Sequence, residues 1–191
     1  MKSKFSVKDI LQPTVILLLI CVVAAALLGG TNAMTKEKIA SIDLEIKADA
    51  MQAVLVEADS FGDGVIISDT LEYSEAKKGD EVIGYAFTVT ESGYGGKIKV
   101  MVGILPDGKV SKVMVIAADN ETPGLGQNVK KDSFLDQFIG KLTDIEVVKG
   151  APSNDSEIQA VTSATISSKA VTRAVNAATA YANENLLKGG N

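Results

Sequence analysis

Hydroxyl side chains are concentrated in one short segment of this chain. Of the seven residues from 162 to 168, five carry a hydroxyl group: Thr162, Ser163, Thr165, Ser167 and Ser168. The apolar spacing that follows predicts a helix over residues 167–187, with these hydroxyls at its start. Serine and threonine are common at that place because they cap unpaired backbone N–H groups. The residues alone permit a second interpretation, because the same N–H groups and the helix dipole attract phosphate, which a clustered hydroxyl can hold or bind covalently.

Two glycine-containing segments precede the hydroxyl cluster. Residues 92–96 read Ser-Gly-Tyr-Gly-Gly before a predicted strand, and residues 121–126 read Glu-Thr-Pro-Gly-Leu-Gly. Ordinary turns explain both compositions. Glycine also lets a backbone approach a bound molecule closely, and Tyr94 offers a ring that can stack on a planar ligand.

The residue inventory excludes several kinds of active site. The chain has no histidine and one cysteine, Cys21, within an apolar run. This excludes Ser-His-Asp and Cys-His nucleophiles, histidine-ligated haem, cysteine-ligated iron–sulfur clusters, Cys/His zinc sites and intrachain disulfides. Redox activity would therefore have to come from a bound organic cofactor. A net charge of -5 without a cluster of Lys and Arg argues against nucleic acid as a partner.

The N-terminal part of the chain has the composition of a transmembrane helix. No charged residue occurs between Ile10 and Thr35. At about 1.5 Å per residue, this stretch can cross a hydrocarbon core about 30 Å thick. We therefore predict a membrane anchor over residues 10–34. A cleaved signal peptide that ends near residues 31–33 is the alternative interpretation.

The charges that flank this anchor predict its orientation. Lys2, Lys4 and Lys8 precede it. The positive-inside rule then places residues 1–9 in the cytoplasm and everything after the anchor outside the cytoplasm.

The remaining periodicity predicts an α+β domain with a central antiparallel sheet and flanking helices over residues 61–191. Helical spacing of apolar residues predicts a stalk helix within residues 35–60, packed along one edge of the domain. Alternating apolar residues predict strands at 83–89, 98–104 and 113–117, and shorter strands at 65–67 and 145–148. Asp132 or Ser133 is expected to cap a short helix, and the last helix should bury one stripe, which consists of Ile166, Ala170, Ala174, Ala177 and Tyr181.

These features together resemble the FMN-binding G-type subunit of the Rnf ion-translocating electron-transport complex, which is related to the C-type subunit of the sodium-pumping NADH:quinone reductase. The family's hallmark is a Ser/Thr-Gly-Ala-Thr segment, which Thr162-Ser163-Ala164-Thr165 matches, and residues 166–171 continue like the family. Residues 121–126 look like the family's Glu-Thr-Pro-Gly-Leu-Gly loop, and the single N-terminal helix is shared. Ser163 stands where the family has glycine, and Gln159 stands where the motif read by the flavin transferase has an acidic residue.

The resemblance implies FMN joined by a phosphodiester to Thr165 by a separate flavin transferase. It places further cofactor contacts at Thr162, Ser163, Ala164, Ser168, Glu121, Thr122, Gly124, Leu125, Gly126 and Tyr94, and it implies no catalytic residue and no metal ligand in this chain.

The resemblance also implies a role in a larger assembly. The chain would relay electrons between neighbouring subunits of a membrane complex that couples electron transfer between ferredoxin and NAD to sodium or proton translocation. Its partners would be the other membrane and peripheral subunits of that complex. The alternatives are the C-type subunit of a quinone reductase, a non-redox anchored binding domain, and a stand-alone flavin reductase. The length of 191 residues favours the Rnf interpretation over the quinone-reductase one.

Overall fold

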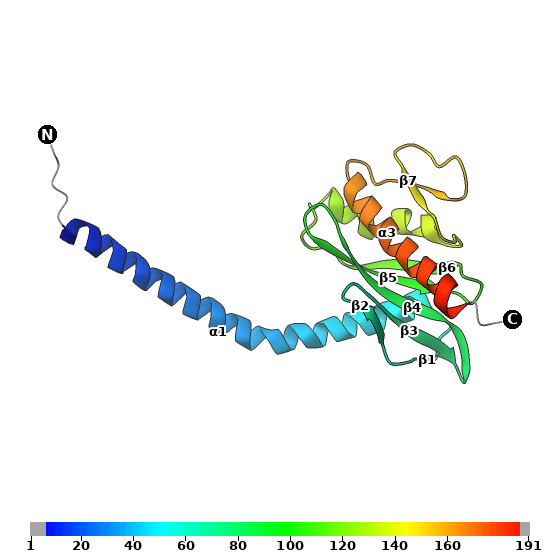
Figure 1. The fold of residues 1–191 in the computed structure, drawn as a ribbon, viewed down its shortest axis with the longest axis horizontal. Coiled ribbons are helices and arrows are strands. Elements are labelled where there is room, and N and C mark those ends of the chain that lie inside the picture. The colour runs from blue at the N-terminus through cyan, green and yellow to red at the C-terminus, as the bar shows by residue number, and fades with distance from the viewer. Residues whose placement is uncertain (1–6, 188–191) are drawn as a thin grey trace. The chain divides into compact units, whose positions relative to one another are not determined.

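The computed structural model describes residues 7–187, which fall into two compact units that meet between Glu45 and Ile46. Helix α1 (Val7–Val54) begins in the first unit and ends in the second (Figure 1). Its segment Ile10–Lys36 is long and apolar enough to cross a membrane, and none of it is buried by protein. This segment is consistent with a single-pass membrane anchor. Most of the predicted cytoplasmic stretch, residues 1–6, lies outside the described residues.

Polar side chains within the anchor bond to the helix itself. The hydroxyls of Thr14 and Thr31 donate to the carbonyl oxygens of Ile10 and Leu27, at 2.7 and 2.8 Å. Such bonding within one helix suits a segment in lipid, where water is not available to polar groups.

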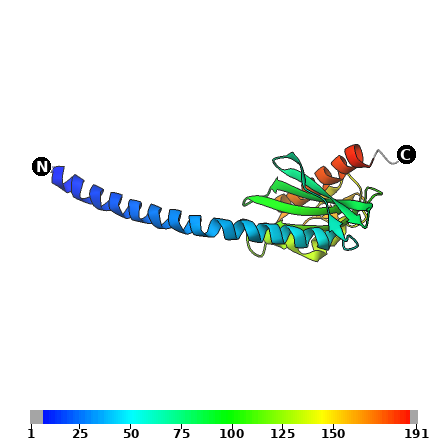
Figure 2. The same cartoon turned by 90° about the horizontal axis from the view of Figure 1, so that it is seen from below.

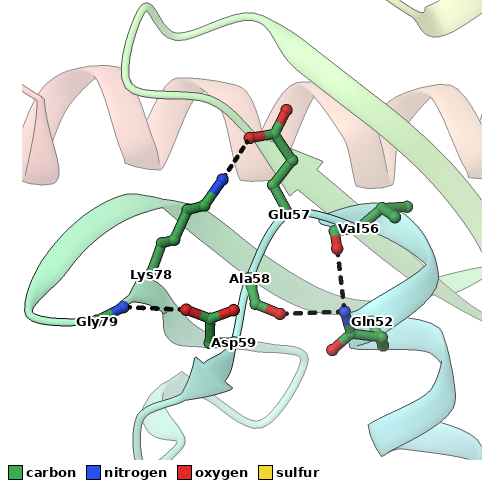
Figure 3. Close-up of polar contacts among 7 residues, drawn as sticks. All are labelled: Gln52, Val56, Glu57, Ala58, Asp59, Lys78 and Gly79. Atoms are coloured by element: carbon green, nitrogen blue, oxygen red, sulfur yellow. Dashed lines mark hydrogen bonds and ion pairs between the residues drawn. The ribbon is translucent and has the colours of Figure 1, made fainter.

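No break separates the anchor from the predicted stalk, because α1 is continuous to Val54. The helix ends in a polar network that also fastens the next turn to the sheet (Figure 3). The Gln52 side-chain amide donates to the carbonyl oxygens of Val56 and Ala58, at 3.2 and 3.1 Å. The Asp59 carboxylate accepts the Gly79 N–H at 3.2 Å. The helix thus stops where the carbonyl groups of the turn that follows it bond to Gln52, a side chain of its own last turn.

The second unit is built on an antiparallel sheet, as predicted. Its strands are β1 (Ser60–Phe61), β2 (Val65–Ser68), β3 (Leu71–Lys78), β4 (Glu81–Ser92), β5 (Lys97–Ile104) and β6 (Val110–Ala117). The order is β1-β3-β4-β5-β6, and β2 also pairs with β3. Strand β3 was not predicted, because the residues that it buries are the small Ser74 and Ala76, which give no apolar alternation.

After the sheet the chain forms a smaller set of elements. They are the 3-10 helix η1 (Gly126–Lys130), helix α2 (Asp132–Leu135), the 3-10 turn η2 (Asp136–Phe138), strands β7 (Glu146–Val148) and β8 (Glu157–Gln159), helix α3 (Thr165–Tyr181) and the π-helical turn η3 (Ala182–Leu186). Strands β7 and β8 pair in parallel. The residue before α2 is Lys131, which makes no side-chain cap, so the predicted capping by Asp132 or Ser133 is wrong.

Each face of the sheet carries its own apolar core. Helix α3 packs on one face through Val171, Ala174, Val175 and Ala178, against the alternate residues Val100 and Val102 of β5. Phe134 and Phe138 complete this core, and their rings meet edge to face with 5.5 Å between the ring centroids. Of the stripe predicted for the last helix, Ala170 and Ala174 are buried and Ala177 and Tyr181 pack against the core, but Ile166 is 53% exposed.

The last part of α1 covers the opposite face of the sheet (Figure 2). Its Met51 and Val54 contact the core that contains Ala86 and Met101. The stalk was predicted to pack along an edge, and this is wrong because the small residues of this face leave room for a helix. Ile83 also joins this side, since a register shift between Ala76 and Lys77 places an extra residue in β4 and changes the alternation.

Candidate functional site

A cavity of about 490 Å³ lies where three separated segments meet, and it has the usual size of a small-molecule pocket. The segments are the β4–β5 loop, the loop after β6 and the first turn of α3. The lining residues are Tyr94, Glu121, Thr122, Leu125, Gly126, Ser163, Ala164, Thr165, Ile166 and Ser167. The structure thus brings the two glycine-containing segments and the hydroxyl cluster to one place.

Glu121, in the loop after β6, bonds to both of the other segments. Its side chain is 2% exposed. One carboxylate oxygen accepts the Gly95 N–H at 2.9 Å, and the other accepts the Ser167 hydroxyl at 2.6 Å. Both oxygens are therefore satisfied, as a buried carboxylate requires.

The glycines around Glu121 are needed for space. A Cβ at Gly93 would overlap one oxygen of the Glu121 carboxylate, and a Cβ at Gly126 would overlap the other. A Cβ at Gly95 would overlap the carbonyl oxygen of Asn120. None of these three glycines has a positive φ. The need for glycine there therefore comes from the close approach of neighbouring atoms to the backbone.

The hydroxyls at the start of α3 do not act as a side-chain cap. The N-cap residue is Ala164, and no side chain in the described part of the protein caps the free N–H groups there. The Ser168 hydroxyl donates to the Ala164 carbonyl oxygen at 2.9 Å and accepts the Val161 N–H at 3.0 Å. The capping interpretation of the cluster is therefore wrong, and the first backbone N–H groups of α3 remain available to a ligand.

The individual hydroxyls have different surroundings. Those of Ser167 and Ser168 are buried and bonded within the protein. Thr165 is half-buried, lines the cavity, and has no side-chain hydrogen bond to any residue that the structure describes. Ser163 also lines the cavity, and its φ of 62° lies in the left-handed region that favours glycine.

Three of the residues expected at the site do not line the cavity. Thr162 faces a neighbouring hollow with Gln137 and Gln159. Ser168 points into the protein and holds the turn before α3. Gly124 lies on the exposed turn with a φ of 74°, and its carbonyl oxygen accepts the Asn128 side-chain amide at 2.6 Å.

Sequence reasoning missed the roles of Ser167, which lines the cavity, and of Arg173, which supports one of its loops from outside. Ser167 looked like one of several capping hydroxyls, and only its contact with Glu121 sets it apart. Arg173 lies two turns along α3 and donates from Nε to Glu91 at 3.0 Å and from Nη2 to the carbonyl oxygen of Ser92 at 2.9 Å. It thereby anchors the start of the loop that carries Tyr94.

The cavity suits a planar ligand that carries a phosphate group. Tyr94, Leu125 and Ile166 offer apolar surface at its rim, with exposed fractions of 71%, 44% and 53%. The hydroxyl of Thr165 also lines the cavity, at the open N–H groups of the first turn of α3, where a phosphate is favoured. Among the described residues, no group of three or more His, Cys, Asp or Glu side chains could hold a metal ion. The apolar rim fits the ring system of FMN, and the Thr165 hydroxyl with the free N–H groups of α3 fits its phosphate.

Sequence comparison agrees with this assignment. The FMN-binding domain family matches residues 93–180, a range that contains all three segments of the cavity, and the RnfG N-terminal region matches residues 1–54. The G-type subunit of the proton-translocating ferredoxin:NAD(+) oxidoreductase complex of Clostridium ljungdahlii is 37% identical over 158 residues, which are 83% of each chain. The G-type subunit of the Na(+)-translocating complex of Acetobacterium woodii is 36% identical over 194 residues and 92% of each chain.

Structural comparison agrees on the fold. The C-type subunit of the Na(+)-translocating NADH-quinone reductase from Parabacteroides distasonis superposes with a TM-score of 0.55 at 17% identity, over 72% of this chain and 90% of that one. At this identity the likeness concerns the fold alone. Because two relatives above 30% identity are matched over most of their length, the chain belongs to the RnfG family, the G-type subunits of the ion-translocating ferredoxin:NAD(+) oxidoreductase complexes.

Proposed function

We propose that this chain is the FMN-bearing electron-relay subunit of a membrane ferredoxin:NAD oxidoreductase complex of the Rnf type, which couples electron transfer to sodium or proton translocation. FMN would be joined through its phosphate to Thr165. The observation that carries the proposal is the cavity at the start of α3, which lies within the matched FMN-binding domain and presents the Thr165 hydroxyl. The names of the relatives support the assignment to such a complex.

Within the hydroxyl cluster of residues 162–168, Thr165 is the hydroxyl best suited to carry the phosphate. Ser167 and Ser168 are bonded within the protein, and Thr162 lies outside the cavity. Ser163 shares the cavity but belongs to the left-handed turn that precedes α3. An ester at Thr165 would place the phosphate beside the open N–H groups of the first helical turn, where the helix dipole favours negative charge.

The chain supplies the acceptor hydroxyl but not the chemistry of attachment. Ester formation joins the hydroxyl oxygen to phosphorus, releases the hydroxyl proton and breaks the bond from phosphorus to a leaving group, so the flavin must arrive as an activated phosphoanhydride whose other phosphate departs. Among the described residues that line the cavity, none is a His, Lys or Cys that could take the proton. A separate flavin transferase would provide that step. A covalent bond also prevents loss of the cofactor, which would matter for a domain held outside the cytoplasm.

The bound flavin would exchange electrons with cofactors of neighbouring subunits. Among the described residues, no His, Cys or Lys lines the cavity, and the one lining acid, Glu121, is engaged by two hydrogen bonds within the protein, so we expect no independent catalytic activity. The other membrane and peripheral subunits of the complex would be the partners of this chain.

The attachment is tested by co-expressing the full chain with a flavin transferase and viewing a denaturing gel under ultraviolet light. We expect a fluorescent band at the mass of the chain for wild type, for Thr165→Ser and for Thr143→Ala, and none for Thr165→Ala. The Thr143→Ala variant is a matched control, since it removes a threonine hydroxyl that lies in a different hollow, outside the cavity and outside the hydroxyl cluster. Absence of the band in wild type would refute covalent attachment of flavin. A band in Thr165→Ala would show that another residue carries the flavin.

We further propose that residues 1–9 lie in the cytoplasm and the domain outside it, because the lysines precede the apolar segment. The anchor would be retained, since the match to the RnfG N-terminal region, residues 1–54, includes this segment. In a Cys21→Ala background, cysteine can be introduced at Asn154, which is exposed, or at Lys4. A membrane-impermeant thiol reagent applied to cells whose outer surface is accessible should label Asn154→Cys and not Lys4→Cys. The reverse pattern would contradict the orientation.

A further inference from the structure

The Glu121 carboxylate lies in the wall of the cofactor cavity without a basic partner among the described residues. Within the part of the chain that the structure describes, it is the only carboxylate that lines the cavity, and no lysine or arginine lines it. None of the ion pairs between described residues involves it. Its two hydrogen bonds come from uncharged donors, the Gly95 N–H and the Ser167 hydroxyl. Buried charges are usually paired with an opposite charge, so this one calls for a functional explanation.

The same carboxylate holds the cavity together. Gly95 belongs to the loop that carries Tyr94, and Ser167 belongs to the helical turn that carries Thr165. Glycines at positions 93 and 126 leave the space that its two oxygens occupy. Three segments that are distant in sequence therefore meet on one side chain.

We propose that Glu121 is a positioning residue that holds the Tyr94 loop against α3, and that its negative charge lowers the midpoint potential of the flavin. The proposal rests on the function proposed above, since it concerns a flavin held in this cavity. Reduction adds electrons to the flavin ring system, and a fixed negative charge in the wall of the same cavity disfavours that addition. The charge would make the bound flavin a stronger electron donor.

Asp119 provides a matched control for the charge. It lies two residues before Glu121, its side chain is 83% exposed, and it pairs with Lys130 at 3.1 Å. Asp119→Asn removes the same formal charge outside the cavity, where solvent and salt screen its effect. Glu121→Gln keeps the size of the side chain and an oxygen that can accept the Gly95 N–H.

The charge is tested by redox titration of the full flavin-loaded chain in detergent. We expect the midpoint potential of Glu121→Gln to shift to a more positive value, and that of Asp119→Asn to stay at the wild-type value. Ser167→Ala keeps the charge and should show no positive shift. An unchanged potential in Glu121→Gln, or an equal shift in Asp119→Asn, would overturn the proposed effect of the charge.

A second measurement needs no flavin and separates this proposal from the previous one. In a Thr165→Ala background, hydrogen exchange monitored by mass spectrometry should be faster in residues 93–96 when Glu121 is replaced by Ala, and unchanged when Asp119 is replaced by Asn. Equal exchange with and without Glu121→Ala would overturn the positioning role. If the wild-type chain shows no fluorescent flavin band, covalent attachment is refuted. The exchange measurement would still test the positioning role of Glu121, because it needs no flavin.

Discussion

The guanidinium of Arg173 lies 3.0 Å from the carboxylate of Glu91, although 82 residues of sequence separate them. Its second nitrogen, Nη2, donates to the carbonyl oxygen of Ser92 at 2.9 Å. One arginine fork thus fastens the end of β4, and with it the start of the Tyr94 loop, to the middle of α3.

Replacement of Arg173 by Lys should loosen the Tyr94 loop without unfolding the domain. A lysine has one compact donor group and cannot reproduce the planar fork toward Glu91 and the Ser92 carbonyl. The pair is partly exposed, so the loss of global stability should stay within about 1 kcal/mol. Hydrogen exchange of residues 92–96 should become faster, while Lys109→Ala, which removes the pair with Asp107 on the β5–β6 turn, should leave that segment unchanged. Wild-type exchange in Arg173→Lys would show that the fork does not hold the loop.

Ser163→Gly should stabilise the protein. Ser163 has a φ of 62°, a conformation that costs an ordinary residue about 1–2 kcal/mol and glycine almost nothing. After the greater chain entropy of glycine in the unfolded state is subtracted, we expect a gain of about 0.5–1 kcal/mol, seen as a higher Tm of the detergent-solubilised chain by calorimetry. Thr162→Gly is the control, because Thr162 has no positive φ and should lose stability. A lower Tm for Ser163→Gly would mean that its side chain contributes more than its backbone costs.

Gly103→Ala should weaken the packing of the last turn of α1 on the sheet. A Cβ at Gly103 would lie 2.6 Å from the carbonyl oxygen of Val54 and 3.0 Å from its Cβ. Since a backbone atom cannot move aside cheaply, we expect a loss of about 1–3 kcal/mol and a lower Tm. Gly150→Ala should be nearly neutral, because no heavy atom lies within 4 Å of its Cβ position. Equal Tm values for the two variants would contradict the close contact between α1 and β5.

The loop before β8 should respond to acid through Glu157. The backbone N–H of Ser153 at 2.7 Å, its hydroxyl at 2.9 Å and the Asn154 side chain at 3.1 Å all donate to the Glu157 carboxylate and lower its pKa below the ordinary value. A carboxylate with a depressed folded-state pKa stabilises the loop above its ordinary pKa, and this contribution is lost as the pH falls through the folded-state value.

Nuclear magnetic resonance can follow this transition. The amide signal of Ser153 should titrate with a midpoint below about 4.3, the usual value for glutamate. Glu157→Gln should abolish that titration. A midpoint at or above the ordinary value would mean that the hydrogen bonds to Glu157 do not persist in solution.

Local sequence determined the elements whose side chains repeat with a clear period. The charge-free stretch from Ile10 predicted the anchor helix, and alternating apolar residues predicted β4, β5 and β6 and their antiparallel order. This succeeds because helical and strand periods are properties of neighbouring residues. The absence of histidine likewise excluded several kinds of catalytic centre, among them Ser-His-Asp and Cys-His nucleophiles, from the sequence alone.

Tertiary structure decided those elements and contacts that depend on packing partners distant in the sequence. Strand β3 buries small residues because helix α1 covers that face, and no local period reports this. The same holds for the hydroxyl cluster, in which residues of one chemical type have different roles. Ser167 bonds to Glu121, Ser168 holds its own turn, and Thr165 faces the cavity. Composition could place these hydroxyls together at a helix start, but only the packing of α3 against two distant loops determines which of them is left for a cofactor.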